Sequence, residues 1–146
     1  MRLDFLVLAD RAEAVNGKLY MVGGGFDRVS VPVFPANANF DVALGAMVDY
    51  NETNEPHSFE LRLENVDNEV VLGPIGGQVE VGRPPGMKPG QSQRVMLVIR
   101  GPFPIPAPGE YSWVAVLDGS QQEPTRFWLD KVELPAVPPP LGKSGG

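Results

Sequence analysis

The sequence predicts an all-β protein: an antiparallel β-sandwich followed by a short tail rich in proline and glycine. Apolar residues recur at every second position within short segments, as they do in half-buried strands. The 17 glycines and 16 prolines separate these segments with turns. The best helical candidate, residues 9–15, is too short and ends at an Asn-Gly pair. Strands at this spacing favour two sheets packed about 10 Å apart.

The length of 146 residues is typical of one domain. We expect residues 1–132 to form the sandwich and residues 133–146, which include three consecutive prolines, to form a flexible tail. The chain has no cysteine, which excludes disulfides, thiolate metal sites and a cysteine nucleophile.

The first segment is interpreted as a strand of the mature protein. Its apolar run of five residues lies between Asp4 and Asp10, whereas a secretory signal needs about 7–15 apolar residues. We therefore expect a cytoplasmic protein. Asn16-Gly17 predicts a hairpin, because both residues accept a positive φ. The triplet at residues 23–25 is interpreted as a bulge or bend, since a strand rather than a helix follows it.

The clearest strand runs from residue 40 to residue 50. It places alternate apolar side chains on one face, and its other face is more polar. The segment that follows, residues 49–55, carries clustered oxygen donors that a hard cation such as Ca²⁺ accepts. It lacks the EF-hand pattern, and a charged connection explains the same residues, so cation binding stays open.

Three later segments continue the alternation, at residues 59–64, 91–100 and 111–117. The second and third carry apolar residues on both faces, which places them in the middle of a sheet or against another layer of structure. Hairpin turns are predicted at Asp67-Asn68 and Asp118-Gly119, and loops at residues 84–90 and 102–109. Residues 79–81 are interpreted as an edge strand that another subunit can pair with.

No motif predicts catalysis, a cofactor or a metal site. His57 is the only histidine, no Gly-x-Ser-x-Gly elbow presents a nucleophile, and the sequence does not bring Asp27 and Glu110 together. We expect His57 to be a solvated residue at the start of a strand. The prediction is a protein that is not an enzyme.

Two groups of residues are candidates for ligand or partner contact. Tyr111, Trp113 and Trp128 can form an aromatic platform, although aromatic residues in the last strands of a sandwich also build cores. Pro135 and Pro138 have the Pro-x-x-Pro spacing that aromatic grooves recognise, although such a terminus is also commonly frayed.

In the N-terminal third, an apolar strand ends in Ala9-Asp10, and it is followed by Gly17-Lys18-Leu19, an apolar strand, a glycine and Phe26-Asp27. These motifs resemble those of a family of small uncharacterised bacterial proteins, a domain of unknown function. Gly109-Glu110-Tyr111 and Asp118-Gly119 extend the resemblance to residues 1–132. The glycine triplet departs from the family, where one glycine and an apolar residue are expected. The resemblance implies an immunoglobulin-like sandwich in the bacterial cytoplasm and brings no catalytic residue.

The net charge and the lengths of the apolar segments argue against nucleic acid and a membrane as partners. The net charge of −6 with scattered basic residues argues against nucleic acid, and no stretch approaches the ~20 apolar residues that span a bilayer. We therefore expect a non-enzymatic binding or scaffold module of the bacterial cytoplasm with a protein partner. The alternative is a sandwich that binds a small ligand or carbohydrate. The sequence leaves the oligomeric state open.

Overall fold

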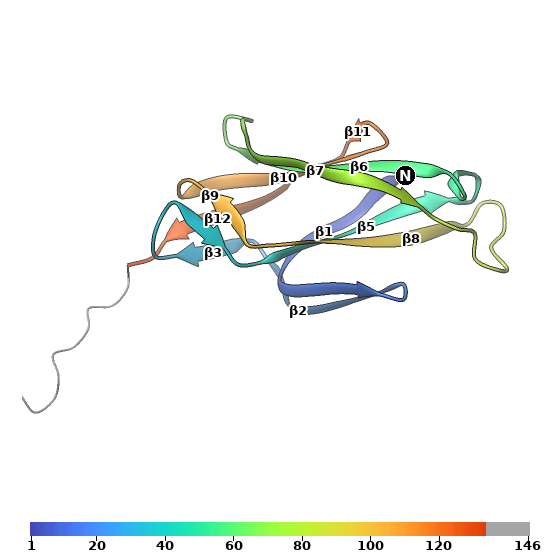
Figure 1. Ribbon diagram of the computed structural model, residues 1–146, viewed down its shortest axis with the longest axis horizontal. Coiled ribbons are helices and arrows are strands. Elements are labelled where there is room, and N and C mark those ends of the chain that lie inside the picture. Colours follow the sequence, from blue (N-terminus) through green and yellow to red (C-terminus); the bar gives the residue numbers. More distant parts are fainter. Residues whose placement is uncertain (134–146) are drawn as a thin grey trace, which may run out of the picture.

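The computed structural model describes residues 1–133 and is all-β, as predicted (Figure 1). Its only helical element is a 3-10 turn, η1 (Tyr50–Glu52). The strands, in chain order, are β1 (Arg2–Val15), β2 (Lys18–Phe26), β3 (Arg28–Val31), β4 (Ala36–Ala38), β5 (Asp41–Asp49), β6 (Pro56–Asn65), β7 (Val70–Glu80), β8 (Ser92–Arg100), β9 (Phe103–Ile105), β10 (Gly109–Leu117), β11 (Ser120–Gln121) and β12 (Thr125–Lys131).

Two sheets face each other, which confirms the β-sandwich. The first has the strand order β2-β1-β5-β8 and the second β3-β12-β10-β6-β7, with β11 paired to β10. All pairs are antiparallel except β12 with β3, which run parallel. The segment predicted as a loop at residues 102–109 contains β9, which pairs only with β4, so Pro104 lies in a two-stranded ribbon that tolerates its missing N–H. The immunoglobulin-like assignment stays a prediction.

The core between the sheets contains a cluster of aromatic rings. Phe103 lies 5.1 Å from Phe40 and 5.0 Å from Trp113 between ring centroids, and Trp113 stacks on Phe127 at 6.3 Å. The face of β5 that the alternation assigned to the core is buried, as predicted. These aromatic side chains come from β10 and β12 of the second sheet, from β9, and from Phe40 just before β5 of the first sheet, so burying them holds the two layers together.

Two predicted hairpin turns have the expected backbone. Asn16 and Gly17 have φ values of 50° and 73°, and Asp118 and Gly119 have 51° and 78°. Two consecutive positive φ values define the turn that matches the twist of antiparallel strands. The Asn-Gly and Asp-Gly signals are therefore confirmed.

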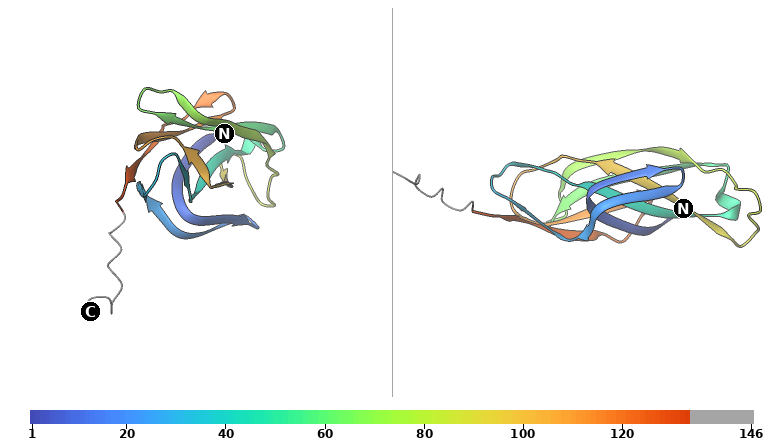
Figure 2. Two further views of the ribbon diagram at one scale, coloured as in Figure 1. Left: turned by 60° about the vertical axis from the view of Figure 1, so that its left-hand side comes forward. Right: turned by 90° about the horizontal axis from the view of Figure 1, so that it is seen from below.

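Strand β1 belongs to two layers. Up to Ala9 it pairs with β5, and from Leu8 onward it pairs with β2, with a register shift between Leu8 and Ala9. Figure 1 shows β2 and the second half of β1 in a layer beyond the sheet of β5 and β8, and Figure 2 shows the same hairpin curling beneath that sheet. We call residues 9–26 the β1–β2 hairpin.

The β1–β2 hairpin covers the more polar face of β5, which is therefore buried as well. Ala9, Ala12 and Ala43 form a small second core, against which Leu19 and Val98 pack. The Asp41 carboxylate is 8% exposed and accepts hydrogen bonds from the N–H groups of Ala12 and Gly101, at 2.9 and 3.1 Å. Asp41 thus attaches the hairpin to the sandwich.

The two strands that are apolar on both faces have different positions. Strand β10 lies between β12 and β6, in the middle of its sheet, as predicted. Strand β8 is an edge strand, and its second face meets the β1–β2 hairpin through Val98. The prediction of a central strand therefore holds for β10, and that of a second layer holds for β8.

Candidate functional site

Polar side chains converge at one end of the sandwich, where β5 ends, η1 follows, and β6 and β8 begin (Figure 1). A cleft of about 570 Å³ opens there. We call it the η1 cleft; its lining residues are Arg2, Asp49, Tyr50, Asn51, Pro89, Gly90, Gln91 and Ser92.

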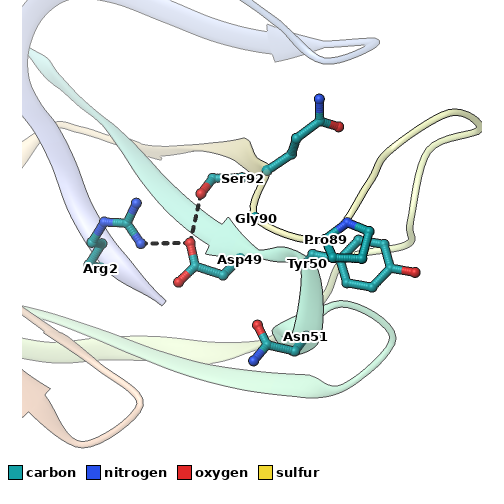
Figure 3. A pocket seen from close by; sticks show the side chains of 8 residues that line it. Arg2, Asp49, Tyr50, Asn51, Pro89, Gly90 and Ser92 are labelled. Atoms are coloured by element: carbon teal, nitrogen blue, oxygen red, sulfur yellow. Dashed lines mark hydrogen bonds and ion pairs between the residues drawn. The ribbon is translucent and has the colours of Figure 1, made fainter.

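The Asp49 carboxylate organises the floor of the η1 cleft. Its Oδ1 accepts a hydrogen bond from Arg2 Nη1 at 2.8 Å and another from Ser92 Oγ at 2.7 Å, so β1, β5 and β8 meet at one atom (Figure 3). The hydrogen bond from Arg2, more than that from Ser92, lowers the pKa of Asp49 below its ordinary value of 3.8. The carboxylate therefore stays ionised.

Tyr50 forms the aromatic part of the cleft. The guanidinium of Arg83 lies 3.7 Å from the centroid of the Tyr50 ring. The same guanidinium donates to the Tyr50 carbonyl at 3.0 Å and to Thr53 Oγ1 at 2.9 Å. Arg83 therefore holds η1 in position and covers one face of the ring.

A second group of charged residues lies beside η1. His57 Nδ1 is 2.8 Å from Asp118 Oδ2, and His57 Nε2 is 2.7 Å from the Glu52 carbonyl oxygen. The Met1 α-amine donates to Glu52 Oε2 at 2.6 Å and lies 3.2 Å from Asp118 Oδ2. We call His57, Glu52, Asp118 and this amine the His57 cluster. It joins the start of β1 to η1, β6 and the β10–β11 turn.

The contacts within the His57 cluster favour its charged forms. Burial opposes charge on His57, but hydrogen bonds to the Glu52 carbonyl and Asp118 outweigh it and raise the pKa above 6.5. Burial also opposes charge on Asp118, yet hydrogen bonds from His57, the amine and the Ser58 N–H lower its pKa below 3.8. The hydrogen bond from the amine lowers the pKa of Glu52 below 4.5.

The expectation of a solvated His57 is wrong. The side chain is 5% exposed and lies at the start of β6 between two oxygen acceptors. The sequence around it, Pro-His-Ser, carries no sign of this, because Asp118 is 61 positions away and reaches His57 only through the pairing of β6 with β10.

Two carboxylates of the 49–55 segment, those of Asp49 and Glu52, have protein partners. Asp49 contacts Arg2 and Ser92, and Glu52 accepts from the Met1 amine and from the Asp49 N–H. Within residues 1–133, no three His, Cys, Asp or Glu side chains are grouped so that they could hold a metal ion. The predicted connection is therefore a short turn closed by ion pairs.

Comparison with known proteins identifies the chain at the level of a family. A family model described as "Family of unknown function (DUF6941)" matches residues 4–129. The chain belongs to DUF6941. The resemblance to a domain of unknown function is thereby confirmed. No curated protein and no solved structure matches the chain.

The DUF6941 match includes the three aromatic residues predicted as contacts. The structure places two of them in the core and the third on the outer face of β12. Trp113 is fully buried and Tyr111 is 4% exposed, with its hydroxyl donating to the Ala107 carbonyl at 2.6 Å. Trp128 is half-buried, 5.1 Å from the Arg28 guanidinium. The three residues therefore form no common surface platform, because the inward face of β10 supplies the core. Pro135 and Pro138 lie outside the described residues and outside the family match.

The DUF6941 domain has a second candidate surface that the sequence reasoning missed. On the β1–β2 hairpin, Tyr20, Met21 and Val22 are 57%, 42% and 68% exposed. The signal was present as a run of apolar residues without polar alternation, but such a run also describes a buried strand. Within the described part of the chain, no helix is long and apolar enough to cross a bilayer.

Proposed function

We propose that this protein is a non-enzymatic binding module of the bacterial cytoplasm that holds an extended segment of another protein against β2. The observation that carries the proposal is the position of β2 at the end of its sheet with three neighbouring apolar side chains exposed. Exposed apolar patches on soluble domains mark interaction surfaces.

The backbone of β2 supports a polypeptide as the occupant. Among residues 1–133, strand β1 is the only partner of β2 in the sheet, so one row of N–H and C=O groups along β2 has no ladder partner in this part of the chain. An added strand satisfies such a row and aligns its own alternate side chains with those of the edge. Edge strands are normally protected by charges, and Lys18 is the only charged residue within β2.

The charge of the hairpin supports recognition by apolar contact. Residues 9–26 contain two acidic residues, Asp10 and Glu13, and two basic ones, Arg11 and Lys18, so this segment is neutral on a chain of net charge −6. The expected occupant is therefore a strand with apolar side chains at alternate positions and no required sign of charge. His57 supports the non-enzymatic part, since both of its ring nitrogens make contacts within the fold.

The experiment is a selection of random twelve-residue peptides displayed on phage, with the purified protein as the target. We expect peptides of alternating apolar residues whose affinity falls at least tenfold with the double variant Tyr20→Lys, Val22→Lys. The matched control is Val70→Lys, which changes a half-exposed valine on β7, the edge strand of the other sheet. Equal binding to the wild type and the double variant would contradict the proposal.

A second candidate is binding of a small hydrophilic ligand or carbohydrate in the η1 cleft. Its size falls in the usual range for ligand sites, and Asn51, Gln91 and Ser92 line it with hydrogen-bonding groups around Tyr50. A panel of monosaccharides added to the ¹⁵N-labelled protein tests it. Amide shifts at residues 49–51 and 90–92 support this candidate, and their absence across the panel counts against it.

A further inference from the structure

The contacts of His57 determine its protonation state. The Glu52 carbonyl, on one side of the ring, has no proton to donate, and the Asp118 carboxylate on the other side is ionised, because contacts with His57, the amine and the Ser58 N–H stabilise its charge. Both ring nitrogens must therefore be donors. A neutral imidazole has one donor nitrogen and satisfies only one of the two acceptors.

The charged groups around the ring balance this cation. Asp118 approaches from the β10–β11 turn, the Glu52 carboxylate from η1, and the Met1 amine from β1. Strand β7 contributes Val79 opposite His57, which carries no charge. The cluster thus holds two anions and two cations, and loss of the His57 proton leaves it with a net negative charge.

His57 is one of several contacts that hold the Glu52 end of η1. The Met1 amine donates to Glu52 Oε2, Arg83 donates to Thr53 Oγ1, and the Asn54 N–H donates to the Val81 carbonyl. The Glu52 carbonyl lies at the end of η1, whose first residues line the η1 cleft. Arg83 and the Gln91 carbonyl secure Tyr50 at the start of the turn. Among the contacts that position Glu52 from outside η1, the bond to His57 is the one that is lost on deprotonation near neutral pH.

We propose that His57 is a proton-dependent latch: as an imidazolium it ties η1 to the β10–β11 turn, and its deprotonation removes its bond to the Glu52 carbonyl and loosens that end of η1 beside the η1 cleft. The device is independent of strand addition at β2, because it lies at the end of the sandwich and not on the hairpin. The raised pKa of His57 agrees with the geometry.

The test is a pH titration of the full chain by NMR, in which the single histidine makes the imidazole signals unambiguous. We expect two protonated ring nitrogens at pH 6 and a midpoint above 6.5. The Thr53 and Asn54 amides are expected to shift with the same midpoint. A neutral ring at pH 6, or a titration that leaves both amides unmoved, would overturn the proposal.

Two carboxylate variants separate the latch from a general effect of charge. Asp118→Asn removes the anion beside Nδ1, and we expect a lower His57 midpoint. The control is Asp130→Asn on β12, which removes an exposed carboxylate 3.6 Å from Arg28 of β3 and leaves the midpoint unchanged. His57→Gln abolishes the pH response of the Thr53 and Asn54 amides. If that variant does not fold, the comparison of the two aspartate variants decides: equal midpoints contradict the latch.

Discussion

The η1 end and the β1–β2 hairpin are two surfaces that the same sandwich supports in opposite ways. At the η1 end, charged groups are paired: Asp49 with Arg2, and Asp118 with His57. On the β1–β2 hairpin, apolar side chains are exposed. The hairpin is attached to the sandwich by the buried Asp41 carboxylate, which accepts hydrogen bonds from two backbone N–H groups. Polar contacts therefore stabilise the η1 end, whereas the β1–β2 hairpin leaves apolar side chains exposed to solvent and available to a partner.

The largest effect is expected in the core that supports both surfaces. Trp113→Ala removes the ring that packs between Phe103 and Phe127, and should lower the free energy of unfolding by about 3–5 kcal/mol. Urea denaturation measures this loss. A change below about 1 kcal/mol, the size typical of an average substitution, would mean that Trp113 is not a core residue.

The second effect tests how the hairpin is attached. Asp41→Ala leaves the N–H groups of Ala12 and Gly101 buried without an acceptor and should cost about 2–3 kcal/mol. Hydrogen exchange should accelerate most at the Ala12 amide and along β2. The amides of β10 should accelerate only as much as the loss of global stability requires. Uniform acceleration across both sheets would show that the hairpin is not a separately attached unit.

The third prediction concerns the pH dependence of the η1 end. Because the folded pKa of His57 is raised, its contribution to stability is complete below the unfolded value of 6.5 and disappears as the pH rises through the folded value. Glu52 and Asp118 have lowered pKa values, so their contribution is present above 4.5 and 3.8 and is lost as the pH falls through their folded values. Urea midpoints from pH 3 to 9 measure both limbs.

His57 contributes to the alkaline limb together with the Met1 amine. Burial opposes charge on this amine, but its hydrogen bonds to Glu52 and Asp118 raise its pKa above 8.0. In His57→Gln, the decline of stability above pH 6.5 should become shallower, and the acidic limb should remain. An identical alkaline decline in the variant and the wild type would assign that limb to other groups.

The smallest effect on stability is expected on the exposed hairpin. Tyr20→Lys or Val22→Lys should change the free energy of unfolding by less than about 0.5 kcal/mol, because both side chains are more than half exposed. Thermal denaturation checks this value. A larger loss in either variant would mean that the apolar edge stabilises the fold, which would weaken the comparison between the two surfaces.

Local signals predicted the elements of the fold well. Asn16-Gly17 and Asp118-Gly119 require positive φ values, and the alternation in β5 places its inward residues correctly. The bend of β1 at Leu8 and Ala9 was not predictable, since the sequence carries no glycine or proline there and the bend arises from two different partner strands. For the same reason the covered outer face of β5 was missed.

The candidate sites were less predictable, because their residues come together only through strand pairing. His57 meets Asp118 across β6 and β10, and Arg2 meets Ser92 at Asp49 through three strands. Trp113 was offered as a contact because a large aromatic residue serves equally in a core or a binding surface, and only the sheet face distinguishes them.

The parallel pairing of β3 with β12 has a consequence for synthesis on the ribosome. Strand β3 is complete by residue 31, yet its sheet partner begins at residue 125, so almost the whole domain must emerge before the pair can form. The nascent chain therefore carries an unpaired β3 until β12 emerges. A truncation before β12 leaves β3 unpaired, which makes incomplete chains prone to aggregation and distinguishes them from finished ones.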